Sequence, residues 1–131
     1  KFFRKITKNK IKTHKILEVK GRKLEIKNFY DKVIKFDFDE LCNKNLGSED
    51  FISIVNICNF IFIENLPNFN EDNSNQQQRF ITLIDIIYEK KIPLMITSQF
   101  SLEQIKSAKN MKDIFKRTVS RLHELTSINL N

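Results

Sequence analysis

Two polar side chains follow short apolar runs in the middle of the sequence, where α/β proteins often bind ligands. Glu64 ends the run Phe60–Glu64, and Ser98 lies in Thr97-Ser98-Gln99 at the end of the next run. Glu64 resembles the metal-binding acid of a Walker B strand, and Ser98 lies where a phosphate-sensing polar residue would lie. A polar strand end and a strand-to-helix turn explain both residues more simply. Glu64 and Ser98 are therefore weak candidates.

Phosphate binding is constrained by the glycine content. The 131 residues contain two glycines, and Gly21 precedes Arg22 whereas Gly47 precedes Ser48. A P-loop requires G-x-x-x-x-G-K-[ST], because its glycines let backbone N–H groups approach the phosphates. Neither glycine fits that motif, and G-x-G-x-x-G is excluded for the same reason. The sequence therefore contains no complete nucleotide site of either type, and no ATP or other cofactor is predicted for this chain.

Two arginines lie four residues apart near the end of the chain, at positions 117 and 121. On a helix, Arg117 and Arg121 would share a face and could contact a phosphate or a facing domain. They could equally form exposed ion pairs with Asp113 and Glu124, each contributing about 0.2–0.5 kcal/mol. The residues alone leave both alternatives open.

The remaining titratable side chains predict no catalytic or metal site. The two histidines accompany no nucleophile motif, and the two cysteines lack the CxxC spacing of a zinc site. The acidic cluster at 37–40 is explained by capping, with Asp39 as the cap of a helical turn at 40–42. Buried, reduced thiols and a cytosol-like interior are expected. The two histidines are His14 and His123, and the two cysteines are Cys42 and Cys58.

The elements that would position these side chains predict an α/β fold. Short apolar runs alternate with amphipathic stretches, which is typical of β-α-β-α-β with right-handed crossovers and a parallel core. An alternating stretch around Gly21 predicts an N-terminal hairpin, and two helices are expected to close the chain. The expected strands are 15–20, 22–27, 32–38, 60–64 and 93–99; the expected helices are 49–59 capped by Ser48, 79–90, 101–109 capped by Ser101, and 111–126, with a polar loop at 68–78.

Charge and length suggest one domain with a basic beginning. Residues 1–35 hold 13 Lys and Arg against three acids, whereas residues 36–131 hold 10 against 13. We therefore divide the chain into a basic connecting segment, 1–14, and an α/β domain, 15–131. Such a segment could let a standalone module bind an acidic partner, lipid or nucleic acid, although a solvated face explains it as well. The first residue is Lys1 rather than Met, so an upstream segment is expected; no transmembrane run or signal peptide is found.

Three later segments resemble the C-terminal part of the ZapE family, which are AFG-type P-loop ATPases of bacteria and mitochondria. Four earlier segments agree with the family in order, so the resemblance covers nearly the whole chain. Its most specific piece is Arg117-Thr-Val-Ser-Arg-Leu122. The segments are Val19–Leu24, Phe36–Cys42, Leu46–Phe51, Ile63–Pro67, Arg79–Glu89, Leu94–Ser98 and Phe115–Leu125.

The resemblance implies that the chain is the C-terminal domain of an AAA+ ATPase that uses ATP and Mg. The Walker A, Walker B and arginine-finger segments would lie upstream of residue 1, so this chain alone should not hydrolyse ATP. The expected partners are the upstream ATPase core, FtsZ or an inner-membrane protein undergoing quality control, and further copies assembled through the core. The expected location is the bacterial cytoplasm, including the periphery of the inner membrane, or alternatively the mitochondrial matrix.

The resemblance also bears on particular arginines. It implies that Arg117 and Arg121 act at an interface or near nucleotide bound to the core. The family has a pair of arginines before the Phe-Ile of the middle helix, whereas here Gln78 precedes Arg79. Arg79 is therefore a weak candidate. The family's closing Glu-Met-Gln-Ser is Glu124-Leu-Thr-Ser127 in this chain.

Overall fold

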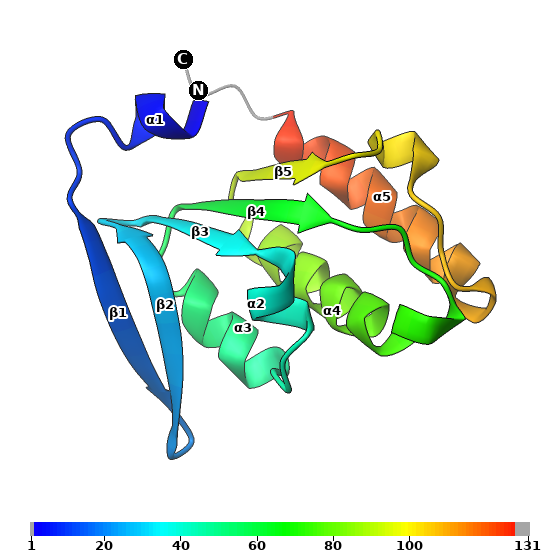
Figure 1. Cartoon of the computed structure of the whole chain (residues 1–131), viewed down its shortest axis with the longest axis horizontal. Helices are drawn as coiled ribbons and strands as arrows, with labels where there is room; N and C mark the ends of the chain where they lie inside the picture. Colours follow the sequence, from blue (N-terminus) through cyan, green and yellow to red (C-terminus); the bar gives the residue numbers. More distant parts are fainter. Residues whose placement is uncertain (1, 128–131) are drawn as a thin grey trace.

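A computed structural model describes residues 2–127 and contains one mixed sheet whose strands lie in the same order as in the sequence. The first three strands pair antiparallel and the last three pair parallel (Figure 1). The predicted α/β class, hairpin and parallel core are confirmed. The strands are β1 (Lys12–Val19), β2 (Arg22–Tyr30), β3 (Val33–Asp37), β4 (Phe60–Leu66) and β5 (Leu94–Ser98).

Besides the strands, the described residues form five α-helices and three short 3-10 turns. Within the described residues, no helix is both long and apolar enough to cross a membrane. The helices are α1 (Phe2–Ile6), α2 (Phe38–Cys42), α3 (Ser48–Val55), α4 (Ser74–Lys90) and α5 (Lys112–Thr126), and the 3-10 turns are η1 (Glu71–Asn73), η2 (Leu102–Gln104) and η3 (Lys109–Met111).

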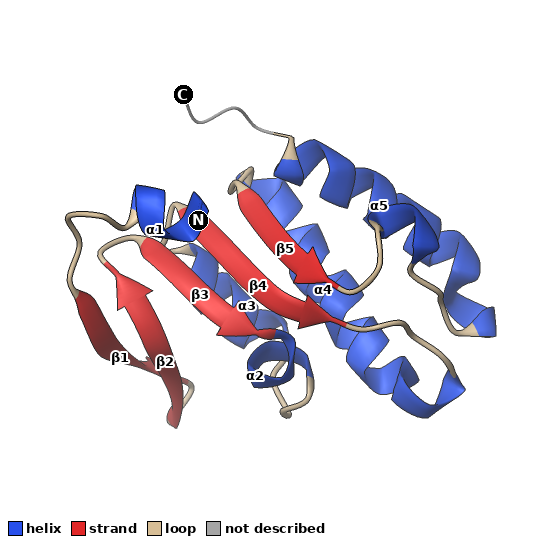
Figure 2. Ribbon diagram, turned by 45° about the horizontal axis from the view of Figure 1, so that its top comes forward, coloured by secondary structure: helices blue, strands red, loops and turns tan. Residues whose placement is uncertain are grey.

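The sequential strand order places the main helices on one face of the sheet. Right-handed crossovers that step in one direction keep their helices on one side, so α3 and α4 lie together there, and α5 packs beside α4 (Figure 2). Inward-pointing residues of the strands, such as Ile34, Phe36 and Ile63, are at most 2% exposed in this core. The regular alternation along each strand is what divides the sheet into two distinct faces.

The opposite face carries a second, smaller apolar cluster under α1. Val33, Phe60 and Phe62 are buried there, and Phe3 of α1 packs against them. The Phe3 ring meets the Phe62 and Tyr30 rings edge-on, at centroid distances of 4.8 and 5.0 Å. Edge-on geometry is favourable for aromatic pairs, so the five-residue helix α1 packs at a defined position on the sheet.

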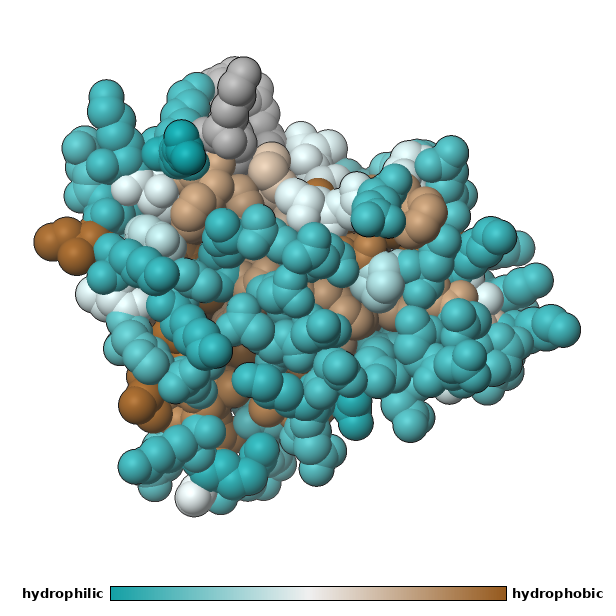
Figure 3. Space-filling model, in the orientation of Figure 1, coloured by the Kyte–Doolittle hydropathy of each residue, from teal (hydrophilic) through white to brown (hydrophobic). Residues whose placement is uncertain are grey.

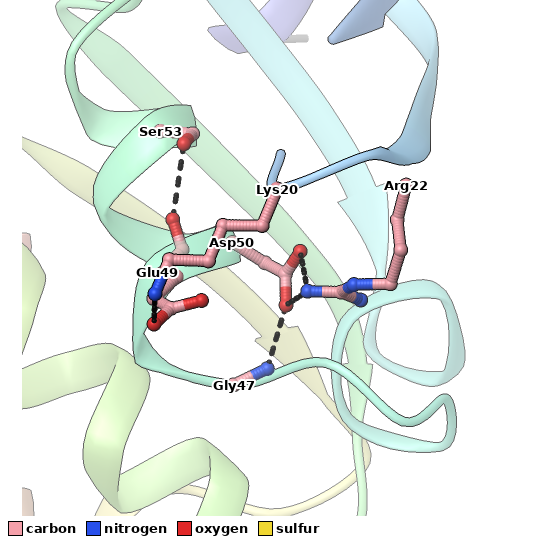
Figure 4. Close-up of polar contacts among 6 residues, drawn as sticks. All are labelled: Lys20, Arg22, Gly47, Glu49, Asp50 and Ser53. Carbon is pink, nitrogen blue, oxygen red and sulfur yellow. Dashed lines mark hydrogen bonds and ion pairs between the residues drawn. The ribbon is translucent and has the colours of Figure 1, made fainter. Parts of the chain in front are cut away.

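The hairpin is joined to α3 by a buried carboxylate. Figure 4 shows Asp50 between the hairpin and the start of α3. Its side chain is 2% exposed and accepts hydrogen bonds from Arg22 Nη2 at 3.0 and 3.1 Å and from the Gly47 backbone N–H at 2.8 Å. Beside it, Lys20 and Glu49 form an exposed ion pair of 2.5 Å. Asp50 therefore both caps α3 and fixes the tip of the hairpin.

Two predicted helix caps are wrong. Asp37, not Asp39, precedes α2: its side chain accepts from the Asp39 backbone N–H at 3.1 Å, and Glu40 accepts from the Asp37 N–H at 2.9 Å. Ser48 is the first residue of α3 and Gly47 is its cap. In both helices an acid in the first turn, Glu40 or Asp50, accepts from the backbone N–H of the residue before the helix, and this contact fixes where the helix begins. Helix α3 also ends at Val55 rather than at residue 59.

One predicted helix start and one predicted helix are also wrong. Helix α4 begins at Ser74 rather than at residue 79. In place of the predicted helix at 101–109, the structure has the 3-10 turns η2 and η3, joined by extended backbone at 105–108. The extended part pairs with the chain after β4: the Phe69 N–H donates to the Lys106 carbonyl at 2.9 Å. Gln77, fully buried, donates to Ser107 Oγ and accepts from the Ala108 N–H. These long-range bonds outweigh the local helical preference.

The surface in Figure 3 is mainly hydrophilic, as expected for a chain with 30% charged residues. Residue 1 and residues 128–131, which the predicted segments 1–14 and 15–131 include, lie outside the described part.

Candidate functional site

The carboxyl ends of the parallel strands hold the first predicted site, and their polar groups bind one another. Asn65 lies near the end of β4 and has a left-handed φ of 64°. The register between β4 and β5 shifts at this point, between Ile63 and Leu66. The Asn65 Nδ2 donates to Asp37 Oδ1 at 2.6 Å, and its backbone N–H donates to Thr97 Oγ1 at 3.1 Å. One residue therefore ties the ends of β3, β4 and β5 together.

The two weak candidates on these strands also have partners within the chain. The Ser98 hydroxyl donates to the Leu66 carbonyl at 2.7 Å and accepts from the Phe100 N–H, which fixes the turn after β5. Glu64 lies 3.4 Å from Lys35, whose ammonium stands 4.7 Å above the Phe3 ring of α1. Glu64 therefore belongs to the α1 side of the sheet, and Ser98 bonds across to β4.

The sheet topology provides no switch point at this edge. In open α/β sheets, ligands bind where the strand order reverses and the crossovers diverge to opposite faces. Here the order from β1 to β5 has no reversal. Asp37, Asn65 and Thr97 therefore form a structural network that bonds the strand ends to one another.

Arg79 reaches back from α4 to the end of α2. Its Nη1 donates to the Cys42 carbonyl at 2.9 Å, one of the carbonyls that a helix end leaves without a helical partner. The side chain therefore fastens α2 to α4.

Arg121 lies in the seam between α4 and α5. It pairs with Asp85, and its guanidinium stacks 4.7 Å from the Tyr88 ring. Tyr88 in turn donates to Glu124 at 2.8 Å; this hydrogen bond, with the charge of Glu124, raises the pKa of Tyr88. Asp85 of α4 is thus the acid that holds Arg121, in place of the predicted pair with Glu124.

Arg117 lies one turn earlier on α5 and is exposed. Among residues 2–127, no acid or carbonyl pairs with its guanidinium, including Asp113. The structure therefore separates the two predicted arginines: Arg121 holds two helices together, whereas Arg117 is exposed and has no side-chain partner among residues 2–127.

An apolar cavity lies among the segments that follow β4 and β5, and the sequence did not predict it. It has a volume of about 590 Å³ and lies where the chain after β4, the 3-10 turns and the first half of α5 meet, on the right of Figure 1. Its floor is apolar and four lysines surround it. A signal was present in the sequence, because these lysines recur between residues 106 and 116. The floor is Phe69, Leu102, Ile105, Phe115 and Val119, and the lysines are Lys106, Lys109, Lys112 and Lys116.

Neither thiol has the environment of a nucleophile. Burial raises the pKa of the Cys42 thiol far above its usual range and raises that of Cys58 to about 12. A thiol must ionise to attack or to bind a metal, so both act as small apolar groups. The described residues contain no group of three or more His, Cys, Asp or Glu side chains arranged to hold a metal ion.

Comparison with known proteins places the chain among ATPases. A profile of the AFG1-like ATPase family matches residues 1–131. Lactation elevated protein 1 homolog B of Danio rerio is 27% identical over 97 residues, which are 74% of this chain and 19% of that protein. Cell division protein ZapE of Escherichia coli (strain K12) is 25% identical over 111 residues, which are 85% of this chain and 30% of that protein. The chain thus spans less than a third of either relative. No solved structure matches it.

Proposed function

Because the chain belongs to the AFG1-like ATPase family, we propose that it is an accessory C-terminal domain of such an ATPase and does not itself hydrolyse ATP. The observation that supports this most directly is the carboxyl edge of the sheet. Asn65 spans it by bonding Asp37 and Thr97, and the strand order has no reversal that would create a ligand-binding switch point there. With no phosphate loop in the sequence, the chain needs another segment to supply nucleotide chemistry.

In this proposal the parent protein binds ATP and Mg through a core upstream of residue 1. Residues 1–14 connect that core to the α/β domain, 15–131, and copies assemble through the core. The name of the bacterial relative supports a role in cell division. In this form of the proposal FtsZ is the partner, and the protein acts in the cytoplasm, at the periphery of the inner membrane. A role in quality control of inner-membrane proteins, in the mitochondrial matrix, is the second form of the proposal.

The first test measures ATP binding by calorimetry and phosphate release, for the 131-residue chain and for the parent that includes the upstream segment. We expect neither binding nor turnover by the chain alone, and turnover by the parent that is lost when its phosphate-loop lysine is replaced. Turnover by the chain alone would contradict the proposal. Salt-dependent binding of DNA or anionic vesicles, lost when Lys5, Lys8, Lys10 and Lys12 are replaced by Glu, would instead favour a standalone binding module.

We also propose that Arg117 contacts the ATPase core, since its guanidinium is exposed and unpaired among the described residues. Arg117→Glu in the parent is expected to lower ATP turnover about tenfold, the effect of losing about 1.4 kcal/mol of interaction. In the isolated chain the same change should leave the free energy of unfolding within about 0.5 kcal/mol.

The control for Arg117 is Lys44→Glu, which reverses another exposed charge in the loop after α2. It should leave turnover unchanged. Equal losses with both variants would show a general charge effect, and no loss with Arg117→Glu would exclude Arg117 from the contact. Arg121 is expected to act on the core only through its pairing with Asp85, by holding α5 in place.

A further inference from the structure

We propose that the cavity beneath the first half of α5 docks an acidic peptide segment of a partner protein, with one or two apolar side chains inserted into it. This proposal does not depend on the chain's role as an accessory domain. The proposal rests on the cavity's fixed walls, its apolar floor and the unbalanced charge around it.

The walls of the cavity are held in place by hydrogen bonds. The Phe69 N–H donates to the Lys106 carbonyl at 2.9 Å, and the Lys106 N–H donates to Asn68 Oδ1 at 2.8 Å, so these bonds run in both directions between the two segments. Gln77, from α4, binds the next two residues, Ser107 at 2.7 Å and Ala108 at 3.0 Å. Segments that are tied at both sides and from below do not collapse into the space, so the cavity is preformed.

The floor offers apolar surface that nothing within residues 2–127 covers completely. Phe69, Ile105 and Phe115 are almost fully buried beneath it, while Leu102 and Val119 are half-buried at its sides. Its volume of about 590 Å³ is within the range of about 300–1,000 Å³ that is usual for specific pockets. That space suits one or two apolar side chains and is too small for the paired acyl chains of a bilayer lipid.

The charge around the opening selects an anionic occupant. All four lysines are exposed, and none forms an ion pair among the described residues. Two acids also line the cavity, but Glu103 is engaged with His123 at 3.2 Å, which leaves Glu71 as the acid without an ion-pair partner. An apolar floor ringed by free ammonium groups complements a peptide in which Asp and Glu flank an apolar anchor.

The test is a selection of random 12-residue peptides displayed on phage against the full chain. We expect the enriched peptides to combine Asp and Glu with Leu, Phe or Trp. A fluorescein-labelled copy of the enriched peptide should bind with a micromolar dissociation constant in fluorescence anisotropy. The affinity for this peptide should fall at least tenfold in Val119→Glu, which places a negative charge at the side of the cavity. It should fall as much in the double variant Lys112→Glu, Lys116→Glu, which reverses two of the surrounding charges.

Matched controls separate the cavity from general effects of charge and exposure. Ile114 is on the same helix, 46% exposed and outside the cavity, so Ile114→Glu should keep wild-type affinity. A double variant Lys44→Glu, Lys90→Glu makes the same change in net charge at remote exposed sites and should weaken binding less than threefold. Val119 is half-buried and the other substituted residues are exposed, and thermal melting checks that each variant folds.

Four results would overturn the proposal. They are the enrichment of no peptide, the enrichment of peptides without acids, equal weakening by cavity and control variants, and unchanged binding to the cavity variants. Phosphatidylglycerol vesicles provide a further arm: if they bind through Lys112 and Lys116 while the peptide does not, the lysines serve a membrane surface and the peptide site is excluded.

Discussion

Replacing Phe69 with alanine is expected to lower the free energy of unfolding by about 3–5 kcal/mol, the usual loss for a buried Phe. Phe69 is 2% exposed and lies 5.5 to 6.0 Å, between ring centroids, from Phe38, Phe80 and Phe115. Its removal opens a space that residues of α2, α4 and α5 border together, so no single element can shift to fill it. Urea unfolding followed by circular dichroism measures the loss.

Two control variants test the prediction for Phe69→Ala. Phe69→Leu keeps most of the volume and should cost clearly less than Phe69→Ala. Phe100 is 37% exposed, so Phe100→Ala should cost well under half as much as Phe69→Ala. Similar losses for Phe69→Ala and Phe100→Ala would show that the aromatic cluster is not the centre of this end of the fold.

Replacing Asp50 with alanine is expected to lower the free energy of unfolding by about 3 kcal/mol, since it removes a helix cap and charge-assisted bonds from a buried site. For a domain of this length that corresponds to a fall in melting temperature of roughly 10 °C. The loss should be greatest for the contact between the hairpin and α3, because Arg22 comes from the hairpin. Thermal unfolding and hydrogen exchange of the β1–β2 amides measure both effects.

The neighbouring Glu49 supplies the control for Asp50. Glu49 pairs with Lys20 in the same two elements, but the side chains are 52% and 71% exposed. An ion pair in that setting contributes about 0–1 kcal/mol, so Glu49→Ala should be nearly neutral. A double-mutant cycle of Asp50→Ala with Arg22→Ala should show coupling of about 1–2 kcal/mol. Equal effects of Asp50→Ala and Glu49→Ala would contradict the prediction.

The sequence predicts the sheet well because the strands have strong local patterns. The runs at 60–64 and 93–99 are apolar on both faces, and the hairpin alternates around Gly21, whose φ of 79° suits the turn. Right-handed connectivity then leaves few topologies to consider. The order of the strands, however, is a property of the whole sheet, and no local pattern encodes it.

The errors concern residues whose partners are distant in the sequence. Gln77 reads as part of a polar loop, yet its bonds to Ser107 and Ala108 bury it and extend α4 toward the N-terminus. The same bonds hold residues 105–108 extended where a helix was predicted. Phe69 stands alone among polar residues, so its periodicity gives no signal, although three elements enclose it.

The candidate site was predictable only in part, for a related reason. The spacing of Arg117 and Arg121 places both on one helix, but which of them is free depends on Asp85 and Tyr88 of α4. The four lysines of the cavity are visible in the sequence. Their common floor is not, because it joins residues from 69 to 119.

The sequential order of the strands in the sheet also affects how the chain folds. Each strand pairs with its predecessor in the sequence, so every strand pairing closes the shortest loop that the connections permit, and the loop-closure entropy is small at each step. A chain emerging from the ribosome can add β3, β4 and β5 in turn, without waiting for a later strand to insert between earlier ones. We therefore expect folding during synthesis to proceed from the hairpin toward α5, with the cavity forming last.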